Sequence, residues 1–250
     1  MLCNQTPCSL LWFRQSESNY KKLLLNPIFS LFVSALMLIC LNQFTNIDLL
    51  LADYYFDFQT NHFIWKNSWF AQQLMHIYIK NAIMFLGFAL ISFVLIDIVI
   101  SFKWVTNWLR IRLRFAAISA LVVPSIISVL KRHSVLHCPW DEQRYGGAAP
   151  YLRLLDSIPS AMEAGHCFPA GHASTGLWLA AFCVFWQPNR PRVAICVFFA
   201  GLCVGFVLGW VQQMRGAHFL SHTLWSMWIA GATVIVMIRV SESFLYSNQQ

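Results

Sequence analysis

Six long apolar runs constrain this 250-residue chain more than any other feature of its sequence. A transmembrane helix needs about 20 apolar residues to cross a hydrocarbon core of roughly 30 Å, and each run approaches that length. Hydrophobic residues make up 58% of the chain and charged residues 11%, which excludes an ordinary soluble domain. The sequence therefore predicts an all-α, polytopic membrane protein with six transmembrane helices. We place these helices at about 26–43, 81–102, 113–130, 171–187, 193–211 and 223–239.

The chain shows no internal repeat, low-complexity tract or Gly/Ser linker, so residues 1–250 are expected to form a single membrane domain. A tail of about 25 residues precedes the first run and carries Arg14, Lys21 and Lys22. No small-residue cleavage site follows this tail. We therefore expect residues 1–25 to be a retained cytoplasmic segment and not part of a cleaved signal peptide.

The distribution of basic residues predicts the orientation. Ten of the seventeen Lys and Arg residues lie in the 1–25 tail, in the loops after the second and fourth runs, and at the end of the last run. Because cytoplasmic loops carry the excess of Lys and Arg, both termini are expected in the cytoplasm. The stretches 44–80, 131–170 and 212–222 are then exterior. The first of these mixes acidic and aromatic residues, which indicates a helix lying at the membrane interface.

The net charge indicates which partner the chain binds, and the cysteines indicate a possible disulfide. The net charge of +7 follows mostly from topology, and no basic stripe interleaved with aromatic residues stands out, so the bilayer and not nucleic acid is the expected partner. Cys138 and Cys167 share one exterior loop, where an oxidising compartment permits a disulfide. The alternative is two buried free thiols.

Polar clusters are expected to converge at the outer membrane surface. Lys131 follows the inner end of its helix by roughly 28 Å at about 1.5 Å per residue, His172 begins the fourth run, and Gln212 ends the fifth. Gln212, Arg215, His218 and His222 are spaced so that a helix would place them on one face. Taken singly, these residues have ordinary explanations as snorkelling or interfacial side chains.

Together, these clusters supply what cleavage of a phosphate ester requires. Such a site needs cations and backbone N–H groups for the phosphate oxygens, an imidazole to attack phosphorus, and an acid for the leaving oxygen. Gly171, in the turn Pro169-Ala170-Gly171-His172, lets backbone donors approach the anion. We assign His172 as the acid and His218 as the nucleophile, with Arg215 about one turn away.

The segments "KRHSVLHCP", "PAGH" and "QMRGAHFLSH" resemble, in this order, the three motifs of the type-2 phosphatidic acid phosphatase family of membrane phosphatases. The resemblance implies removal of phosphate through a phosphohistidine, without a metal ion or cofactor. It also implies that His172 is the acid and His218 the nucleophile. A bacterial inner membrane, with the site facing the periplasm, is expected on the same basis.

Four positions depart from the family pattern. Lys131 matches, but Cys138 and Gln212 replace arginines, Ala170 replaces a serine, and His222 replaces an aspartate. Each lost charge-assisted hydrogen bond costs about 1.5–3 kcal/mol.

Other residues are candidates to compensate for these losses. Arg215, and either Arg144 or Arg132, are the candidate replacement cations for phosphate binding. Asp141 is the first candidate to orient His218, followed by His222 and Glu163.

The leading hypothesis is a phosphatase that hydrolyses a lipid phosphate or diphosphate on the exterior leaflet. The alternatives are a lipid phosphotransferase, a catalytically degenerate member that binds lipid, and a metal or haem protein with His166, His172, His218 and His222 as ligands. Neither the lipid nor the oligomeric state is predicted by the sequence.

Overall fold

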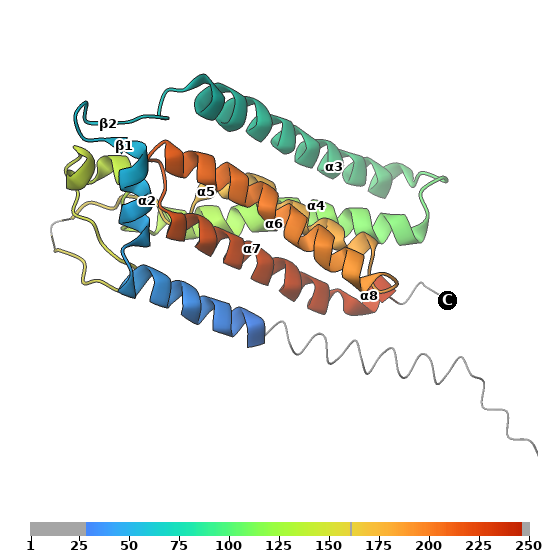
Figure 1. Ribbon diagram of the computed structural model, residues 1–250. Coiled ribbons are helices and arrows are strands. Elements are labelled where there is room, and N and C mark those ends of the chain that lie inside the picture. The colour runs from blue at the N-terminus through green and yellow to red at the C-terminus, as the bar shows by residue number, and fades with distance from the viewer. Residues whose placement is uncertain (1–28, 161, 247–250) are drawn as a thin grey trace, which may run out of the picture. The chain divides into compact units, whose positions relative to one another are not determined.

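The computed structural model describes residues 29–160 and 162–246, so the predicted cytoplasmic tail 1–25 lies outside the described residues. Contacts divide the chain into two units, Met1–Met37 and Leu38–Gln250. In the first unit, residues 29–37 are helical. The second unit holds the other described helices and strands. Its long helices are η1 (Trp69–Ile79) with α3 (Lys80–Ile100), α4 (Asn107–Arg132), α6 (Pro191–Met214) and α7 (Leu220–Val240) (Figure 1).

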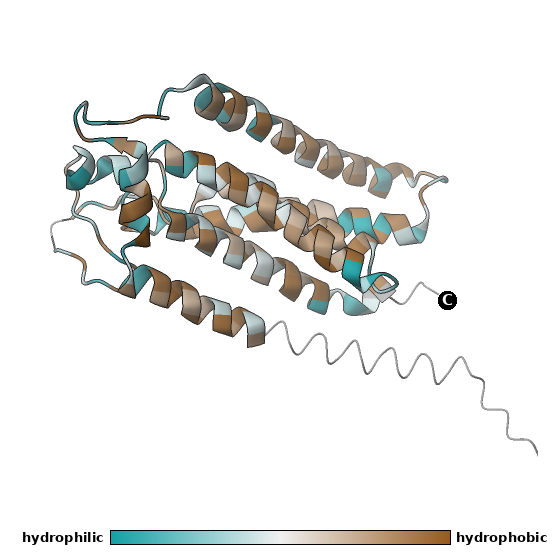
Figure 2. Cartoon of the chain, viewed as in Figure 1, coloured by the Kyte–Doolittle hydropathy of each residue, from teal (hydrophilic) through white to brown (hydrophobic). Residues whose placement is uncertain are grey.

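Four helices in the described part of the chain are long and apolar enough to cross a membrane. They contain the predicted runs 81–102, 113–130, 193–211 and 223–239, apart from a residue or two at the ends. A bent pair, Phe29–Phe44 and Ile47–Tyr55, would make a fifth span. Figure 2 shows apolar residues along the middle of these helices and hydrophilic residues toward their ends. The protein is therefore a helical membrane protein with four to five apolar helices able to span a bilayer.

The predicted fourth span, 171–187, forms a shorter apolar helix, Gly171–Phe185. It begins as α5 (Gly171–Leu177) and continues as the 3₁₀-helix η4 (Trp178–Phe185). Leu177, Trp178, Ala180 and Ala181 are almost fully buried among the other helices. This segment therefore lies in the protein core, with much less lipid-facing surface than the four long helices.

The region 44–80 is not one interfacial helix, and this corrects the sequence-based expectation. It contains α2 (Ile47–Tyr55), a hairpin of β1 (Phe56–Asp57) and β2 (His62–Phe63), and η1. The Asp57 carboxylate accepts hydrogen bonds from the Gln59 N–H (2.9 Å) and the Thr60 hydroxyl (2.5 Å), which favours a turn at this point.

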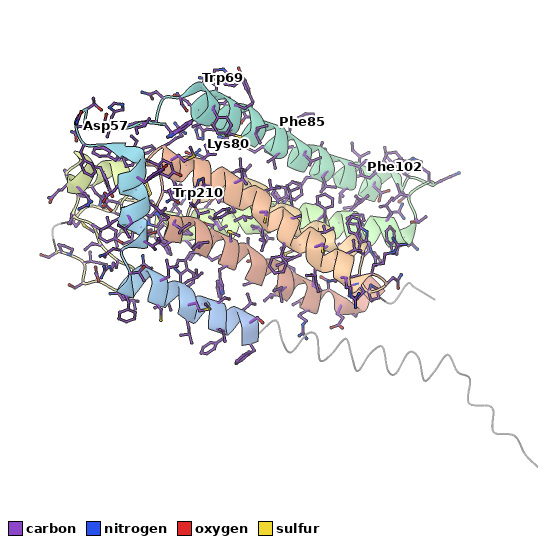
Figure 3. The ribbon with its side chains drawn as sticks, in the orientation of Figure 1. Asp57, Trp69, Lys80, Phe85, Phe102 and Trp210 are labelled. Carbon is purple, nitrogen blue, oxygen red and sulfur yellow. A yellow bond between two sulfur atoms is a disulfide. The ribbon has the colours of Figure 1, made fainter. Side chains whose placement is uncertain are left out.

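The second long helix consequently begins at Trp69, well before the predicted residue 81. Figure 3 labels Trp69, which begins the π-helical segment, and Lys80, which begins α3. Ser68 caps it by accepting a hydrogen bond from the Ala71 N–H (3.2 Å). Polar residues in this segment interrupt the apolar pattern, which is why hydropathy alone placed the helix start too late.

Glycines allow α6 to pack closely against its neighbours. Gly201, Gly205 and Gly209 recur every four residues, and a Cβ on any of them would collide with Ala180, Leu177 or Thr223 respectively. Small residues at this spacing let helix backbones approach one another in membranes. The close packing joins α6 to the Gly171–Phe185 helix on one side and to α7 on the other (Figure 1).

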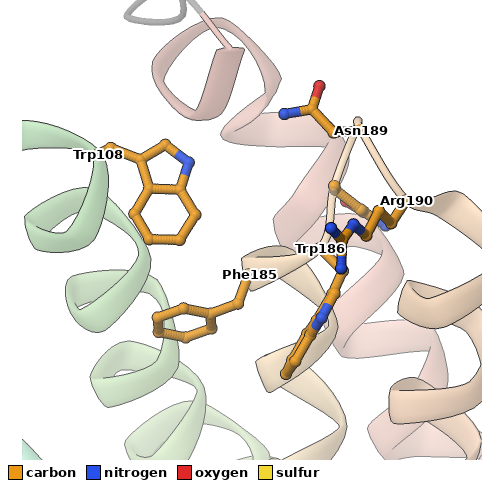
Figure 4. A pocket seen from close by; sticks show the side chains of 6 residues that line it. Trp108, Phe185, Trp186, Asn189 and Arg190 are labelled. Carbon is orange, nitrogen blue, oxygen red and sulfur yellow. The ribbon is translucent and has the colours of Figure 1, made fainter.

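A buried arginine links two helices at the end of the bundle where α4 begins. Arg112, 1% exposed, donates hydrogen bonds to the carbonyl oxygens of Val184 and Gln187, both at 2.9 Å, and stacks on Trp108. A pocket of about 210 Å³ lies here (Figure 4). It is lined by Trp108, Phe185, Trp186, Gln187, Asn189 and Arg190. Because Lys131 ends α4, this pocket lies at the opposite end of that helix from the predicted site.

Candidate active site

Two hydrogen bonds join the Pro-Ala-Gly-His turn to the beginning of α7. The Ala170 N–H donates to the carbonyl oxygen of His222 (3.2 Å), and the Ser226 hydroxyl donates to the carbonyl oxygen of Ala170 (3.0 Å). Ala170 itself is fully buried. The Ser174 hydroxyl donates to the carbonyl oxygen of Gly171 (2.6 Å), so it is directed at the backbone. The Pro-Ala-Gly-His turn and the beginning of α7 are therefore fixed to one another.

This attachment brings three histidine rings together. The ring centroids of His172 and His218 are 5.9 Å apart, and those of His218 and His222 are also 5.9 Å apart. His218 is 1% exposed and His222 is 4% exposed, whereas His172 is only partly buried. His172 therefore gives the histidine cluster its more accessible edge.

Lys131 lies beside the beginning of α5. A Cβ on Gly171 would stand 3.4 Å from Cδ of Lys131 and 3.7 Å from its Nζ. Within the described residues, the amine has no hydrogen bond or ion pair. The absent side chain at position 171 thus leaves room for the Lys131 amine beside the beginning of α5.

Gln212 and Arg215, at the end of α6, are hydrogen-bonded to each other. Arg215 Nη1 donates to Gln212 Oε1 (3.0 Å), and Arg215 Nε donates to the carbonyl oxygen of Lys66 (3.2 Å). Gln212 Nε2 lies 3.1 Å from Nδ1 of His76. This pair therefore connects the end of α6 to the segment that precedes α3.

His76, on η1, is a site residue that the sequence analysis missed. Its ring centroid is 4.6 Å from that of His172, closer than any other described histidine ring. His76 lies in the stretch interpreted as an interfacial helix, and no motif spacing links it to His172. Its position four residues before Lys80, at the beginning of an apolar run, was the only available signal.

Arg144 and Asp141 have hydrogen-bond partners outside the histidine cluster. Arg144 forms a bidentate pair with the Asp53 carboxylate at 2.8 and 2.6 Å, and Tyr145 donates to the same carboxylate (2.9 Å). Asp141 accepts a hydrogen bond from the Trp140 indole (3.0 Å) and is exposed. Neighbours from α2 and from their own loop thus hold both side chains.

A disulfide joins Cys138 to Cys167, with their Cα atoms 5.3 Å apart. The Cys167 sulfur lies 3.4 Å from Nδ1 of His218. A disulfide sulfur carries no hydrogen, so a hydrogen bond across this distance requires the proton to be on Nδ1. Burial holds the pKa of His218 well below its usual value, and the neighbouring His222, Lys131 and His172 act in the same direction. Burial therefore favours neutral His218, and a hydrogen bond from Nδ1 to the sulfur would leave Nε2 unprotonated.

His222 contacts His218 by ring packing, and its Nδ1 has no hydrogen-bond partner among the described residues. Glu163 contributes only its carbonyl oxygen, which contacts the His137 ring (3.0 Å). Neither residue is hydrogen-bonded to His218.

The potential metal ligands that cluster in the described chain are Cys138, Cys167 and His218, with ligand atoms within 4.8 Å of one another. Cysteine binds metals as a thiolate, and here the two sulfur atoms are bonded to each other. His166, part of the alternative histidine set, lies exposed in the preceding loop. With the disulfide formed, these two sulfur atoms offer no thiolate to a metal ion.

One of three comparisons with known proteins found a match. No curated protein and no solved structure matches the chain. The family model of the PAP2 superfamily matches residues 111–245, more than half of the chain, and this range includes Lys131, His172 and His218. That superfamily generally comprises phosphatases acting on phosphate esters. The chain belongs to the PAP2 superfamily.

Proposed function

We propose that this protein hydrolyses a lipid phosphate or diphosphate on the exterior leaflet, through a phosphohistidine on His218 and without a metal ion. The juxtaposition of the His172 and His218 rings, 5.9 Å apart, carries the proposal. An acid works within about 2.6–3.2 Å of the atom it protonates, and a nucleophile attacks from about 3–3.5 Å. Rings at this separation can both reach one phosphoryl group.

The first step is attack by His218 Nε2 on phosphorus. The hydrogen bond from Nδ1 to the Cys167 sulfur leaves the Nε2 lone pair free. A bond forms between Nε2 and phosphorus, the bond from phosphorus to the lipid oxygen breaks, and His172 gives its proton to that oxygen. His172 then removes a proton from water, and the resulting hydroxide displaces phosphate from His218. This step returns His218 to the neutral form and His172 to the protonated form.

Cations supply the electrostatic part of catalysis. In this proposal Lys131 contacts the non-bridging phosphate oxygens, and its closeness to Gly171 supports that role. Arg215 acts from the other side through Gln212, which replaces the arginine of the family pattern. In a site partly shielded from water, such charges stabilise a phosphoryl group more strongly than they would in solvent.

Six spans, with the site outside and both termini inside, remain our proposal for the topology. A helix of seven α-helical and eight 3₁₀-helical residues reaches roughly 26 Å, because the 3₁₀ rise is about 2.0 Å per residue. Gly171–Phe185 is thus nearly long enough to cross the hydrocarbon core of a bilayer. The basic residues near the other end of the bundle support an inner location for that end.

The test is to offer the purified protein a panel of lipid phosphates and diphosphates and to measure phosphate release. We expect release by the wild-type protein and a loss of about 10³-fold or more in His172→Ala and His218→Ala. His62→Ala, an exposed histidine on the β-hairpin, is the matched control. Release that survives both site substitutions contradicts the residue assignment. Release that requires an added acceptor indicates a phosphotransferase, and no turnover of any lipid favours a binding protein.

A further inference from the structure

We propose that His76 is a positioning residue for His172 in the reaction proposed above, and that it acts as a neutral imidazole. The inference rests on the proposed function for the role of His172. It starts from a contact that no motif predicts, the 4.6 Å separation of the two ring centroids at an interplanar angle of 55°. His76 also lies outside residues 111–245, the part of the chain that the family model matches.

A chain of hydrogen bonds determines the tautomer of His76. Arginine only donates, so the Gln212 oxygen must face Arg215 (3.0 Å) and the amide nitrogen must face His76 (3.1 Å). The amide nitrogen is a donor, and therefore Nδ1 of His76 is the acceptor and carries no proton. The proton of a neutral His76 is consequently on Nε2.

The same chain opposes protonation of His76. An imidazolium has a proton on both nitrogens, which would place an N–H of His76 against the N–H group of Gln212. Rotating the amide to relieve this conflict would set its nitrogen against the Arg215 guanidinium. Arg215 and Gln212 thus keep His76 uncharged.

A neutral neighbour matters because His172 must carry a proton to act as the acid. Burial already opposes this proton, and so do a charged His76, Lys131 from α4, Lys80 from α3 and Arg215 from the end of α6. The neutral His218 adjoins the same ring. A second imidazolium, 4.6 Å away, would further disfavour protonated His172. His76 therefore provides a ring that contacts His172 without adding charge.

His172 depends on this contact because its Nδ1 is buried and has no hydrogen-bond partner in the described chain. Catalytic histidines are commonly oriented by a hydrogen bond to that nitrogen. Here the ring of His76 and its anchor to Gln212 hold the plane of His172 instead. π-Helical segments such as η1 occur frequently at functional sites.

Three variants separate positioning from general stability, with phosphate release measured across pH. We expect His76→Ala to lower kcat about 10- to 100-fold with KM changed less than about threefold, because a misplaced acid slows only the chemical step. His76→Phe keeps the ring contact and should recover most of this loss. The control is His62→Ala, which should behave as the wild-type protein does.

Gln212→Glu tests the charge of His76. A carboxylate accepts from both Arg215 and a protonated Nδ1, so His76 becomes cationic and the alkaline limb of the pH profile moves down by about one unit. The shift should vanish in the double variant His76→Phe/Gln212→Glu. A shift that persists in the double variant, or equal losses in His76→Ala and His76→Phe, overturns the proposal.

Nitrogen NMR of ¹⁵N-histidine protein in detergent distinguishes failure of this inference from failure of the proposed function. We expect His76 as the Nε2–H tautomer in the wild-type protein and as a cation in Gln212→Glu. An Nδ1–H tautomer contradicts the inference whether or not any lipid is hydrolysed. If His76 has the expected tautomer but the His172 signal stays unmoved in both His76→Phe and His76→Ala, the inference is also contradicted. Absence of turnover alongside the expected spectra refutes only the proposed reaction.

Discussion

Nδ1 of His218 lies 3.4 Å from the sulfur of Cys167, which is itself bonded to Cys138. The two cysteines and the histidine come from different parts of the chain, so the disulfide both closes the loop 138–167 and contacts the proposed nucleophile. In the family pattern, an aspartate at position 222 and an arginine at position 138 would provide the charged groups. Here a neutral sulfur occupies the place next to His218.

Removing the disulfide should therefore affect both stability and activity. Closing a loop of sequence separation 29 stabilises a protein by about 3–4 kcal/mol in the chain-entropy model. We expect Cys138→Ser/Cys167→Ser to lower the free energy of unfolding by about this amount and to lower kcat, as measured by thermal unfolding in detergent and phosphate release. Cys196→Ser, an exposed free cysteine, is the control. Unchanged kcat in the double variant would show that the sulfur does not orient His218.

Lys131 should contribute to phosphate binding and to stabilising the transition state. Lys131→Met removes the cation but keeps most of the side-chain volume, so we expect a loss in kcat/KM of about 10- to 100-fold, corresponding to about 1.5–3 kcal/mol. Lys103→Met, an exposed residue at the other end of the bundle, should change little. Equal effects of the two substitutions would argue against a role for Lys131 in the site.

Glu142 should make the protein less stable as pH rises. Its side chain is 2% exposed, and burial, followed by the nearby Asp48 and Asp141, raises its pKa to about 9 from 4.5. Between these values the folded protein keeps a proton that the unfolded chain has lost. The free energy of unfolding therefore falls as pH rises through this window, by up to about 1.4 kcal/mol per pH unit.

The isosteric Glu142→Gln variant lacks this titration, so its stability relative to the wild-type protein should increase from about pH 5 to about pH 9. Thermal unfolding at several pH values measures the difference. Glu163→Gln, at an exposed carboxylate, should run parallel to the wild-type protein. A wild-type-like pH dependence in Glu142→Gln would show that Glu142 is ionised in the folded state.

The packing of α6 predicts an unequal response to methyl groups. In Gly201→Ala the new Cβ would stand 2.6 Å from Cα of Ala180, a backbone atom that cannot move away. We expect a loss of about 1–3 kcal/mol in the free energy of unfolding. In Gly231→Ala the new Cβ would stand 3.4 Å from the Phe198 ring and 3.8 Å from Cδ1 of Leu202, both ordinary contacts, so this variant should be neutral or slightly stabilising. Similar unfolding temperatures for the two variants would contradict the close helix contact.

Much of the site could be predicted because the rise per residue of an α-helix is constant. A rise of about 1.5 Å per residue places Lys131, His172 and Gln212 at one level, and the structure brings the first two beside each other. The cysteine pairing was open to prediction because both residues lie in one loop. These inferences needed only distances along the chain.

The remainder depended on contacts between distant segments. His76 meets His172 only because η1 extends the second long helix outward past residue 80, and its polar residues hid that extension. Arg144 was available for phosphate in the sequence, but α2 brings Asp53 within 2.6 Å of it. Charge and spacing do not show which partner a side chain will find.

The continuous helix from Trp69 to Ile100 has 32 residues. At about 1.5 Å per residue it measures roughly 48 Å, well beyond a hydrocarbon thickness of roughly 30 Å. This single helix carries His76 near its N-terminal end and exposed apolar side chains along the rest of its length. Any change in bilayer thickness that tilts this helix moves the imidazole at its tip relative to His172. We therefore expect the acyl-chain length of the surrounding lipids to affect the position of His76 relative to His172.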